Sequence, residues 1–387
     1  YLFIIKGDLM LDRDEINTVY SKLKEYSILN YHVLESMADW VRLVDHDGNI
    51  LYANEAMKKA LGYDIVGKKC YETTGKTRRC DFCIARRSII NNEVVQKEEI
   101  INGRYYSVIS SPVKDLDGNI IGAVEVLRDV TRERKLELEL IERNTKMIND
   151  IKFAEKIQRR ILPKKGLYKN VKIDHLYKPS EMLSGDIFDV FIIDEDKLGV
   201  YICDVVGHGI TASMMTMFVR QTMRSIKDFI VQPSVALTEL QKSFSSLDLG
   251  VDKYFTIFYG VFNAKTNQFI YANAGHNCIP IRYNSNGIEM LKTKGLPISL
   301  IFSEIYYEEN EIVLEEGDKI LLYTDGISEV KNAKGEEFGI DRIINIIKEE
   351  NKDVLNRIIE EVEDFRWGEQ KDDYAMLLME ILESTES

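Results

Sequence analysis

The fold is decided by the stretch LGVYICDVVGHGITAS (198–213), in which an apolar strand runs into the start of a helix. Asp204 is the charged residue of that strand, and Gly207 and Gly209 flank His208 shortly after it. An acid at the end of an apolar strand is an unusual core residue, because burying an unpaired charge is costly. Glycines let the backbone come close to a ligand, and the first N–H groups of a helix favour anions. The stretch therefore predicts a functional site at the end of this strand.

Three further acidic motifs lie in the same half of the chain, each at a turn or strand end: SGDIFDV (184–190), TDG (324–326) and DDYAMLL (372–378). An isolated Asp-Gly pair is usually only a turn. Acids at the ends of several apolar strands can instead meet at one sheet edge, where they repel each other unless a cation lies between them. We therefore predict a carboxylate-built site for divalent metal, with two ions that activate water for hydrolysis.

The residue types of this region favour Mg²⁺ or Mn²⁺ over Zn²⁺ or Cu²⁺, because oxygen donors are plentiful and histidines are few. The histidines of this region are His175, His208 and His276. Cys203 lies inside an apolar strand and Cys278 lies near a proline, so both are interpreted as core residues rather than nucleophiles.

Composition excludes several classes of protein. The chain has 387 residues and a net charge of −13, which argues against binding to nucleic acid or to an anionic membrane surface. No apolar run reaches the roughly 18–20 residues of a membrane span, and the first residues do not resemble a signal sequence. Five unevenly spaced cysteines do not form a disulfide framework, so we expect a cytoplasmic protein. Because the sequence begins with Tyr, we expect it to be part of a longer chain.

We interpret the chain as an α+β multidomain protein of four segments. Residues 1–30 are a lead-in with a helical pattern, 31–130 a small α/β sensor module, 131–165 a helical linker, and 166–387 the domain with the acidic motifs. In the last domain many predicted strands are joined by gaps of hairpin length. Such gaps favour antiparallel sheets with helices packed outside over a doubly wound fold.

The expected secondary structure follows from apolar periodicity and turn signals. In the sensor module we expect a hairpin over 41–54, a helix over 55–61, and strands over 93–101, 104–113 and 119–128. In the last domain we expect strands over 171–178, 187–194, 197–204, 254–263, 267–273, 279–283, 288–292, 311–314, 318–324 and 373–382. We expect helices there over 209–229, 233–247, 338–349 and 352–366.

The linker has the pattern of a two-stranded coiled coil. It contains no Pro or Gly from 128 to 162, and its apolar residues recur mostly every three or four positions until Pro163. Polar Arg143 and Asn144 interrupt the seam. We expect a homodimer through the helix over 131–162; the alternative is a solvated helix lying on one of the domains.

The ordered motifs resemble the PPM family of metal-dependent Ser/Thr phosphatases, most closely its SpoIIE/RsbU branch, which regulates bacterial sigma factors. The resemblance covers residues 150–384. It is carried by five segments: SGDIFDV, DVVGHGITAS, NAGHNCIPI (273–281), GDKILLYTDGISEV (317–330) and DDYAMLL. It implies an α-β-β-α sandwich with two Mn²⁺ or Mg²⁺ ions between the sheets.

The resemblance also implies the ligands. Asp204 would bridge both ions, and the carbonyl of Val205 would complete the first site. Asp325 and Asp372 would hold the second ion, with Asp373 as the less favoured member of its pair, and Asp186 would bind an ion or its waters. These carboxylates are the expected catalytic residues.

Two motifs depart from the usual pattern of the family. Ser184 stands where the first motif usually has a glycine, and Tyr374-Ala375 follow the last acids in place of Met-Thr. Neither change removes a ligand. Asn273 and His276 either shape the site or only form a capped hairpin turn.

The segment AEKIQRRILP (154–163) resembles the regulatory helix of this branch. It implies that the helix docks on the catalytic domain and controls formation of the second metal site. At the front of the chain, DHDGNILYANEAMKKALGYDIVGKKCYE (45–72) and the terminal RDVT (128–131) resemble a PAS sensor domain. The ligand of the PAS domain is not indicated.

Three cysteines in the sensor module leave alternatives open. Cys80 and Cys83 form a C-x-x-C motif, and Cys70 lies nearby. The cluster would bind zinc or an iron–sulfur cluster, or act as a redox switch favoured by nearby arginines, or consist of incidental surface thiols.

We therefore predict a PAS-regulated, Mn²⁺- or Mg²⁺-dependent hydrolase of phosphoserine or phosphothreonine on a protein. The resemblance implies that the substrate is a phosphorylated anti-sigma-factor antagonist of the STAS type. Two alternatives are a catalytically inert PPM-like binding module and a PAS-linked nucleotide cyclase. Intact acids in all four motifs argue against the first, and the last two motifs have no role in the second.

Overall fold

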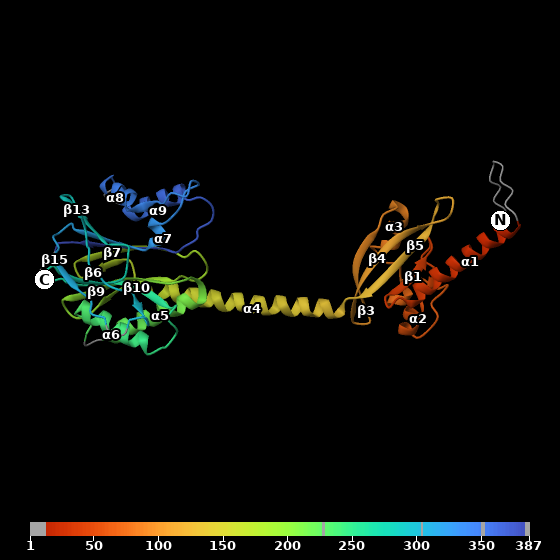
Figure 1. The fold of residues 1–387 in the computed structure, drawn as a ribbon, viewed down its shortest axis with the longest axis horizontal. Coiled ribbons are helices and arrows are strands. Elements are labelled where there is room, and N and C mark those ends of the chain that lie inside the picture. Colours follow the sequence, from red (N-terminus) through yellow and green to blue (C-terminus); the bar gives the residue numbers. More distant parts are fainter. Residues whose placement is uncertain (1–12, 227–228, 303–304, 350–352, 384–387) are drawn as a thin grey trace. The chain divides into compact units, whose positions relative to one another are not determined.

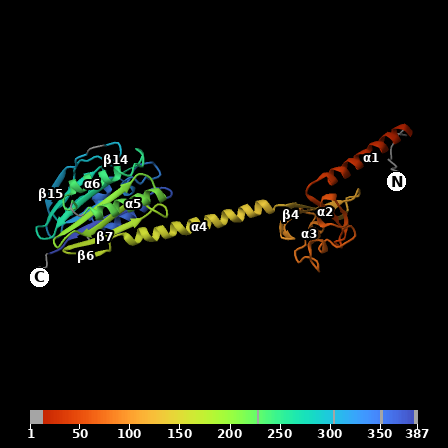
Figure 2. The same cartoon turned by 90° about the horizontal axis from the view of Figure 1, so that it is seen from below.

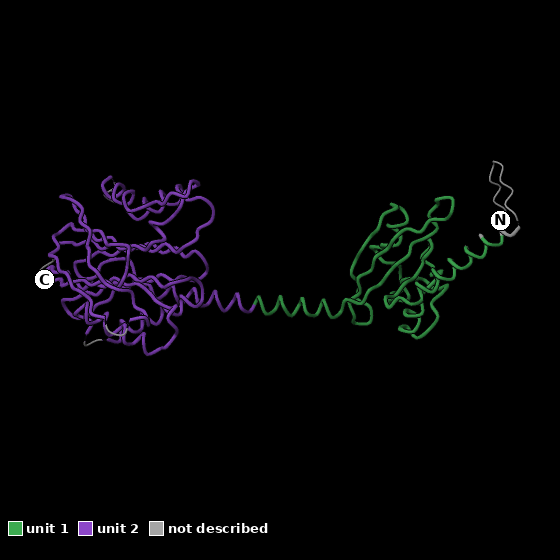
Figure 3. Tube along the Cα trace, in the orientation of Figure 1, with its two compact units in different colours: residues 1–145 green, residues 146–387 purple. Residues whose placement is uncertain are grey.

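The computed structural model describes residues 13–226, 229–302, 305–349 and 353–383. The predicted lead-in therefore lies partly outside the described residues, as do the predicted helix positions 227–228 and 352. Two compact units, residues 1–145 and 146–387, are described separately (Figure 3).

The first unit is a five-stranded antiparallel sheet in the order β2-β1-β5-β4-β3, with helices packed on it (Figure 1). Its elements are α1 (Arg13–Ser36), β1 (Trp40–Val44), β2 (Ile50–Ala53), α2 (Glu55–Leu61), η1 (Glu72–Thr74), α3 (Ile84–Asn91), β3 (Val95–Ile101), β4 (Arg104–Lys114) and β5 (Ile120–Asp129). The strands match those expected from the sequence to within two residues, whereas η1 and α3 were not predicted.

Local chemistry explains the predicted hairpin and helix of this unit. The carboxylate of Asp45 accepts hydrogen bonds from the backbone N–H groups of Asp47 and Asn49, which closes the turn between β1 and β2. Asn54 caps α2 by accepting from the N–H of Met57, and Gly62 ends the helix in a left-handed conformation.

The linker is a single helix, α4 (Thr131–Ile161). It begins where the Asp129 carboxylate accepts a hydrogen bond from the N–H of Thr131. Leu136, Leu140 and Met147 of the expected seam are exposed on it. Pairing of this seam with a second copy stays a prediction.

The second unit contains two six-stranded sheets in which all the described strand pairs are antiparallel. The first sheet consists of β15 (Glu309–Val313), β11 (Gln268–Ala274), β10 (Tyr254–Asn263), β9 (Lys197–Val205) and β8 (Asp186–Ile192), with β14 (Ile298–Ser299) paired to β10. The second consists of β13 (Gly287–Met290), β12 (Ile281–Asn284), β16 (Lys319–Tyr323), β17 (Tyr374–Ile381), β7 (Val171–Lys178) and β6 (Gly166–Tyr168).

Helices cover both outer faces of the two sheets. On the first sheet lie α5 (Gly209–Ser225) and α6 (Pro233–Ser245), which Figure 2 shows side by side. On the second lie α8 (Gly339–Glu349) and α9 (Val354–Phe365), at the top of the unit in Figure 1. A short helix, α7 (Asp325–Ser328), follows β16.

Three apolar cores hold these four layers together. The middle core joins the inner faces of the two sheets through side chains such as Phe188, Phe258 and Leu377. The outer cores lie between each sheet and its helices. This arrangement confirms the expected α-β-β-α sandwich. Among the described elements of this unit, the short β6, β14 and α7 were not predicted, because two to four residues carry too little periodicity.

Candidate metal centre

The acidic motifs of the first sheet lie opposite each other on two neighbouring strands. Asp186 begins β8, Asp204 stands near the end of β9, and the two residues are direct partners in the antiparallel register. Side chains of directly opposed residues lie about 5 Å apart at their Cβ atoms. The register therefore brings together two acids that are 18 positions apart in the sequence.

The second sheet contributes the remaining acids. Asp325 follows β16 as the first residue of α7, and Asp372 lies just before β17. Because β16 and β17 are paired, both acids lie at the same end of this sheet. Asp373, the neighbour of Asp372, accepts hydrogen bonds from Ser184 and Gly185 beside Asp186, so the acidic ends of the two sheets meet.

Burial and mutual repulsion raise the pKa values of these carboxyls. Burial, and then repulsion from Asp325 and Asp372, raise the pKa of Asp204 to about 7. Burial and the neighbouring charge of Asp372 raise the pKa of Asp325 to about 6. Burial and Asp204 raise the pKa of Asp186 well above its usual range. Such shifts arise where like charges share a site of low polarity.

A divalent cation fits this chemistry. Oδ2 of Asp186 is buried, and within the part of the chain that the structure describes it has no hydrogen-bond partner. An orphaned carboxylate oxygen among other carboxylates is a ligand for a hard cation. Among the described residues, no three Asp, Glu, His or Cys side chains already converge tightly enough to hold an ion. Cation binding would have to draw these mutually repelling acids together.

The backbone also fits the expected role of Val205. A Cβ on Gly185 would lie 3.0 Å from the carbonyl oxygen of Val205 and 2.7 Å from that of Gly207. Only glycine at position 185 therefore allows the first motif to lie this close to the loop after β9. The assignment of Asp186, Asp204, Val205, Asp325 and Asp372 as ligands stays a prediction, now supported by this juxtaposition.

Asp373 has a different environment from Asp372. Its Oδ1 accepts hydrogen bonds from the N–H and the hydroxyl of Ser180, at 2.6 and 2.9 Å. Its Oδ2 accepts from the hydroxyl of Ser184 and the N–H of Gly185, at 2.7 and 2.8 Å. Asp373 is buried and Asp372 is exposed. Asp373 therefore fixes the loop of the first motif, whereas Asp372, whose exposed carboxylate accepts a hydrogen bond from the N–H of Asp373 through Oδ1, stays the predicted ligand of the pair.

The structure also explains the serine that departs from the family pattern. Besides donating to Asp373, the hydroxyl of Ser184 accepts a hydrogen bond from the N–H of Asp186. Ser184 thus joins the last acidic motif to the first, a role that the sequence did not reveal.

Sequence reasoning missed Gln158 altogether. This residue of α4 is buried; its Oε1 accepts from the N–H of Ser184 at 3.0 Å, and its Nε2 donates to the carbonyl of Ser184 at 2.8 Å. Nε2 also lies 3.2 Å from the hydroxyl of Thr216 on α5. The sequence feature that could have revealed this contact is the single glutamine within AEKIQRRILP, which lies between apolar positions of the helix.

The Asn273 and His276 pair forms a buried turn. The amide oxygen of Asn273 accepts from the N–H of His276, and its amide nitrogen donates to the carbonyl of His276. The His276 ring lies between the hydroxyl of Thr256 and the carbonyl of Tyr323. Burial lowers the pKa of His276 to about 4, so the ring is neutral at pH 7. The pair braces the strand end that precedes Asp325.

The remaining candidates lie outside the acidic cluster. His208 is exposed and pairs with Glu181, 3.0 Å between Nδ1 and Oε1. Cys203 and Cys278 are buried, as expected for core residues. Cys70, Cys80 and Cys83 belong to the first unit, where they line a common cavity.

Comparison with known proteins agrees with both units. Residues 34–135 match the family model of the PAS fold, and residues 194–382 match that of Stage II sporulation protein E (SpoIIE). The chain thus carries a domain that matches the PAS fold and a domain that matches SpoIIE. The SpoIIE match begins after the first acidic motif, so the place of Asp186 rests on its register opposite Asp204.

Two curated relatives come from Bacillus subtilis (strain 168). The chain is 30% identical over 187 residues to phosphoserine phosphatase RsbP, covering 48% of this chain and 46% of that protein. It is 28% identical over 215 residues to phosphoserine phosphatase RsbU, covering 54% of this chain and 59% of that protein. The chain thus spans about half the length of the curated relatives it matches.

A solved structure shows the same fold. The SiaA-PP2C domain of Pseudomonas aeruginosa superposes with a TM-score of 0.54 and 20% identity, covering 62% of this chain and 98% of that domain. At this level of identity the likeness concerns the fold alone. No helix among the described residues has both the length and the apolar character needed to cross a membrane.

Proposed function

We propose that this chain is a PAS-regulated protein phosphatase that hydrolyses phosphoserine or phosphothreonine with two Mn²⁺ or Mg²⁺ ions. The observation that carries the proposal is the unpartnered, buried oxygen of Asp186 opposite Asp204, with Asp325 and Asp372 at the facing sheet. When bound, the ions would supply an activated water and stabilise the phosphoryl oxygens.

The protein's own contribution is a set of fixed positions. Asp186 and Asp204 are held in register by the β8–β9 ladder, and Asp325 is held by the start of α7. Asp373 and Ser184 hold the first motif against the last. Asp372 stands at the exposed rim, where a phosphorylated side chain of another protein can enter. Such preorganisation lowers the cost of assembling the reactive geometry.

The substrate we propose is a phosphorylated anti-sigma-factor antagonist of the STAS type, in a bacterial cytoplasm. Two relatives are phosphoserine phosphatases by name, which supports the reaction class. The exposure of Asp372 at the rim of the site supports a protein substrate over a small molecule, because enclosed pockets are typical of small ligands.

The linker helix is the proposed route of regulation. Gln158 binds both backbone groups of Ser184, which in turn holds Asp373 and Asp186. Displacement of the end of α4 would break two buried hydrogen bonds at the first acidic motif. We propose that the PAS domain acts through this contact, in a homodimer that pairs along 131–162.

The decisive experiment measures phosphate release from a phosphoserine protein substrate by the full chain with Mn²⁺. Wild type is compared with Asp204→Asn and with a matched control, Asp196→Asn, at the exposed turn before β9. We expect Mn²⁺-dependent release from wild type and the control, and a loss of more than about 100-fold in Asp204→Asn. Equal release from all three would refute the assignment. Metal binding without release from any substrate tried would favour the inert module.

A further inference from the structure

The three cysteines of the PAS domain share one small cavity. Cys70 precedes η1, whereas Cys80 and Cys83 lie in the loop that leads into α3. All three line a cavity of about 20 Å³, together with the buried ion pair of Arg42 and Glu125. A space of this size holds about one water molecule. The thiols themselves are therefore the reactive groups available in this part of the PAS core.

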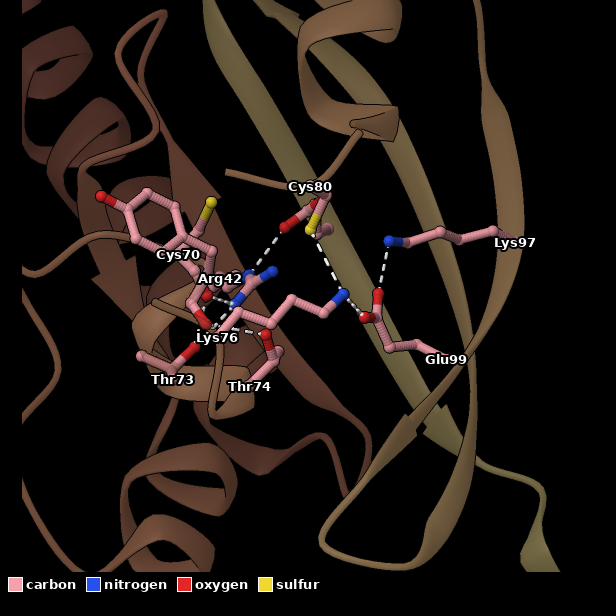
Figure 4. A network of polar contacts seen from close by, with 10 residues as sticks. Arg42, Cys70, Thr73, Thr74, Lys76, Cys80, Lys97 and Glu99 are labelled. Atoms are coloured by element: carbon pink, nitrogen blue, oxygen red, sulfur yellow. Dashed lines mark hydrogen bonds and ion pairs between the residues drawn. The ribbon is translucent and has the colours of Figure 1, made fainter. Parts of the chain in front are cut away.

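A lysine lies directly against one of the thiols. Nζ of Lys76 donates a hydrogen bond to Sγ of Cys80 at 3.4 Å and also forms an ion pair with Glu99 on β3 (Figure 4). Glu99 has a second partner, Lys97. An ammonium group beside a sulfur stabilises negative charge on it, and the charged form is the nucleophile in thiol chemistry.

The same thiol is reachable from solvent. Cys80 also lines a surface pocket of about 670 Å³, whose wall carries four basic residues, Lys76, Arg78, Arg79 and Lys97, and three acidic residues, Asp81, Glu98 and Glu99. Cys80 is half-buried, so a small oxidant can reach its sulfur through this pocket. Cys70, in contrast, is buried on the inner side, and burial raises the pKa of its thiol.

The second thiol of the C-x-x-C motif stands at a helix start. Cys83 is the N-cap residue of α3, an eight-residue helix, and its side chain makes no capping hydrogen bond. Its sulfur is therefore not committed to the helix. A metal cluster is disfavoured, because the Lys76 ammonium already lies against Cys80 where a cation would bind.

We propose that Cys80 and Cys83 are a redox-active dithiol that hydrogen peroxide converts to a disulfide. The charged sulfur of Cys80 attacks the peroxide, the O–O bond breaks, and the departing oxygen leaves as water after protonation. The resulting sulfenic acid is attacked by the Cys83 sulfur; the S–S bond forms, the S–O bond breaks, and a second water leaves. The two thiols lose two electrons and two protons, and the peroxide is reduced.

The disulfide would change contacts that lie next to the signalling elements. Lys76 would lose its hydrogen bond to the Cys80 sulfur, and the start of α3 would be tied to residue 80. The helix α3 packs on β4 and β5, and β5 runs directly into α4. Oxidation thus acts on the strand that precedes the linker helix, and the proposal does not depend on the metal centre.

The test is peroxide titration of the reduced full chain in a chelating buffer, followed by alkylation of free thiols, trypsin digestion and mass spectrometry. Cleavage after Lys and Arg separates CYETTGK (70–76) from CDFCIAR (80–86), so Cys70 is read independently of the pair. We expect CDFCIAR to lose two hydrogens and resist alkylation, and to regain both thiols with dithiothreitol, while CYETTGK stays alkylated.

Matched variants identify the role of each group. Cys70→Ser should leave the linkage unchanged, and Cys83→Ser should leave a sulfenic acid on Cys80 that dimedone traps. Lys76→Met should slow oxidation roughly tenfold, whereas Lys97→Met, which removes the other partner of Glu99, should not. Circular dichroism checks that each variant is folded.

Several results would overturn the proposal. These are a linkage through Cys70, full alkylation of CDFCIAR after peroxide, or equal oxidation rates for Lys76→Met and wild type. A chain that binds one equivalent of added Zn²⁺ through all three thiols, and is thereby protected from alkylation, would establish a metal site instead.

Discussion

Asp373→Asn provides the sharpest test of how the metal centre is held together. Asp373 accepts from four donors: the N–H and hydroxyl of Ser180, the hydroxyl of Ser184 and the N–H of Gly185. An asparagine offers one oxygen, so its amide nitrogen must face two of these donors. A hydroxyl can rotate to accept, but a backbone N–H cannot, and at least one buried N–H is left without a partner.

The magnitude follows from these contacts. One orphaned buried N–H costs about 2 kcal/mol, and replacing charged by neutral acceptors costs about 2 kcal/mol more over the remaining bonds. The substitution also removes the repulsion that Asp373 exerts on Asp186 and Asp204, which stabilises the folded state by about 1 kcal/mol. The net loss of about 3 kcal/mol corresponds to a fall in melting temperature of about 6–12 °C for a domain of this size.

The assay is differential scanning calorimetry of the full chain without metal, because bound ions would add stability of their own. The matched control is the neighbouring Asp372→Asn, whose carboxylate is exposed. We expect the control to unfold at or slightly above the wild-type temperature, while metal titration shows weakened binding. If Asp373→Asn lowers the melting temperature by less than about 2 °C, or if the two variants behave alike, the assignment of separate roles is wrong.

Three further predictions use other contacts. Gln158→Met keeps the shape of the side chain but removes both hydrogen bonds to Ser184. Isothermal titration calorimetry should show that the affinity for Mn²⁺ is reduced by about tenfold. An unchanged affinity would mean that α4 does not influence the metal site. Gly326→Ala places a Cβ 1.9 Å from the carbonyl oxygen of Asp373. We therefore expect urea denaturation to show a free energy of unfolding that is lower by more than about 3 kcal/mol. The control Gly287→Ala, where the space around the added Cβ is open, should change it little. The pKa of His276 is about 4 in the folded protein and about 6.5 in the unfolded chain, so the stability from the neutral ring is fully present above pH 6.5 and falls toward pH 4. Between pH 7 and pH 5, the free energy of unfolding of wild type should therefore fall by about 2 kcal/mol more than that of His276→Gln. Parallel pH profiles of the two proteins would contradict the neutral, buried ring.

The local elements were predictable because their signals are local. The hairpin turn at Asp45–Asn49, the Asn54 cap and the strand that carries Asp204 near its end each depend on residues within a few positions. Alternation and helical periodicity then placed most strands and helices within two or three residues. The acids could be nominated for the same reason, since each follows or precedes an apolar strand.

What each acid does was decided by contacts across the chain. Neighbouring residues of an extended strand point to opposite faces, so the sequence shows that Asp372 and Asp373 differ but not which one faces the metal. Ser180 and Ser184, almost 200 positions away, donate hydrogen bonds to Asp373, which supports Asp372 as the predicted ligand. The same holds for Gln158, whose partner Ser184 lies in another layer.

The sequence by itself determined antiparallel sheets with helices packed outside and nominated the acids, because strand patterning and turn chemistry depend on short windows, while the order of the motifs carried the resemblance that implied the α-β-β-α sandwich and the PAS module. Only the tertiary structure decided which carboxylates remain free, which residue joins the linker helix to the first motif, and which lysine lies against Cys80. Those outcomes depend on strand register and on the packing of layers, which bring residues distant in the sequence close together in space. Hydrogen bonds and strong charge interactions form only at such short distances.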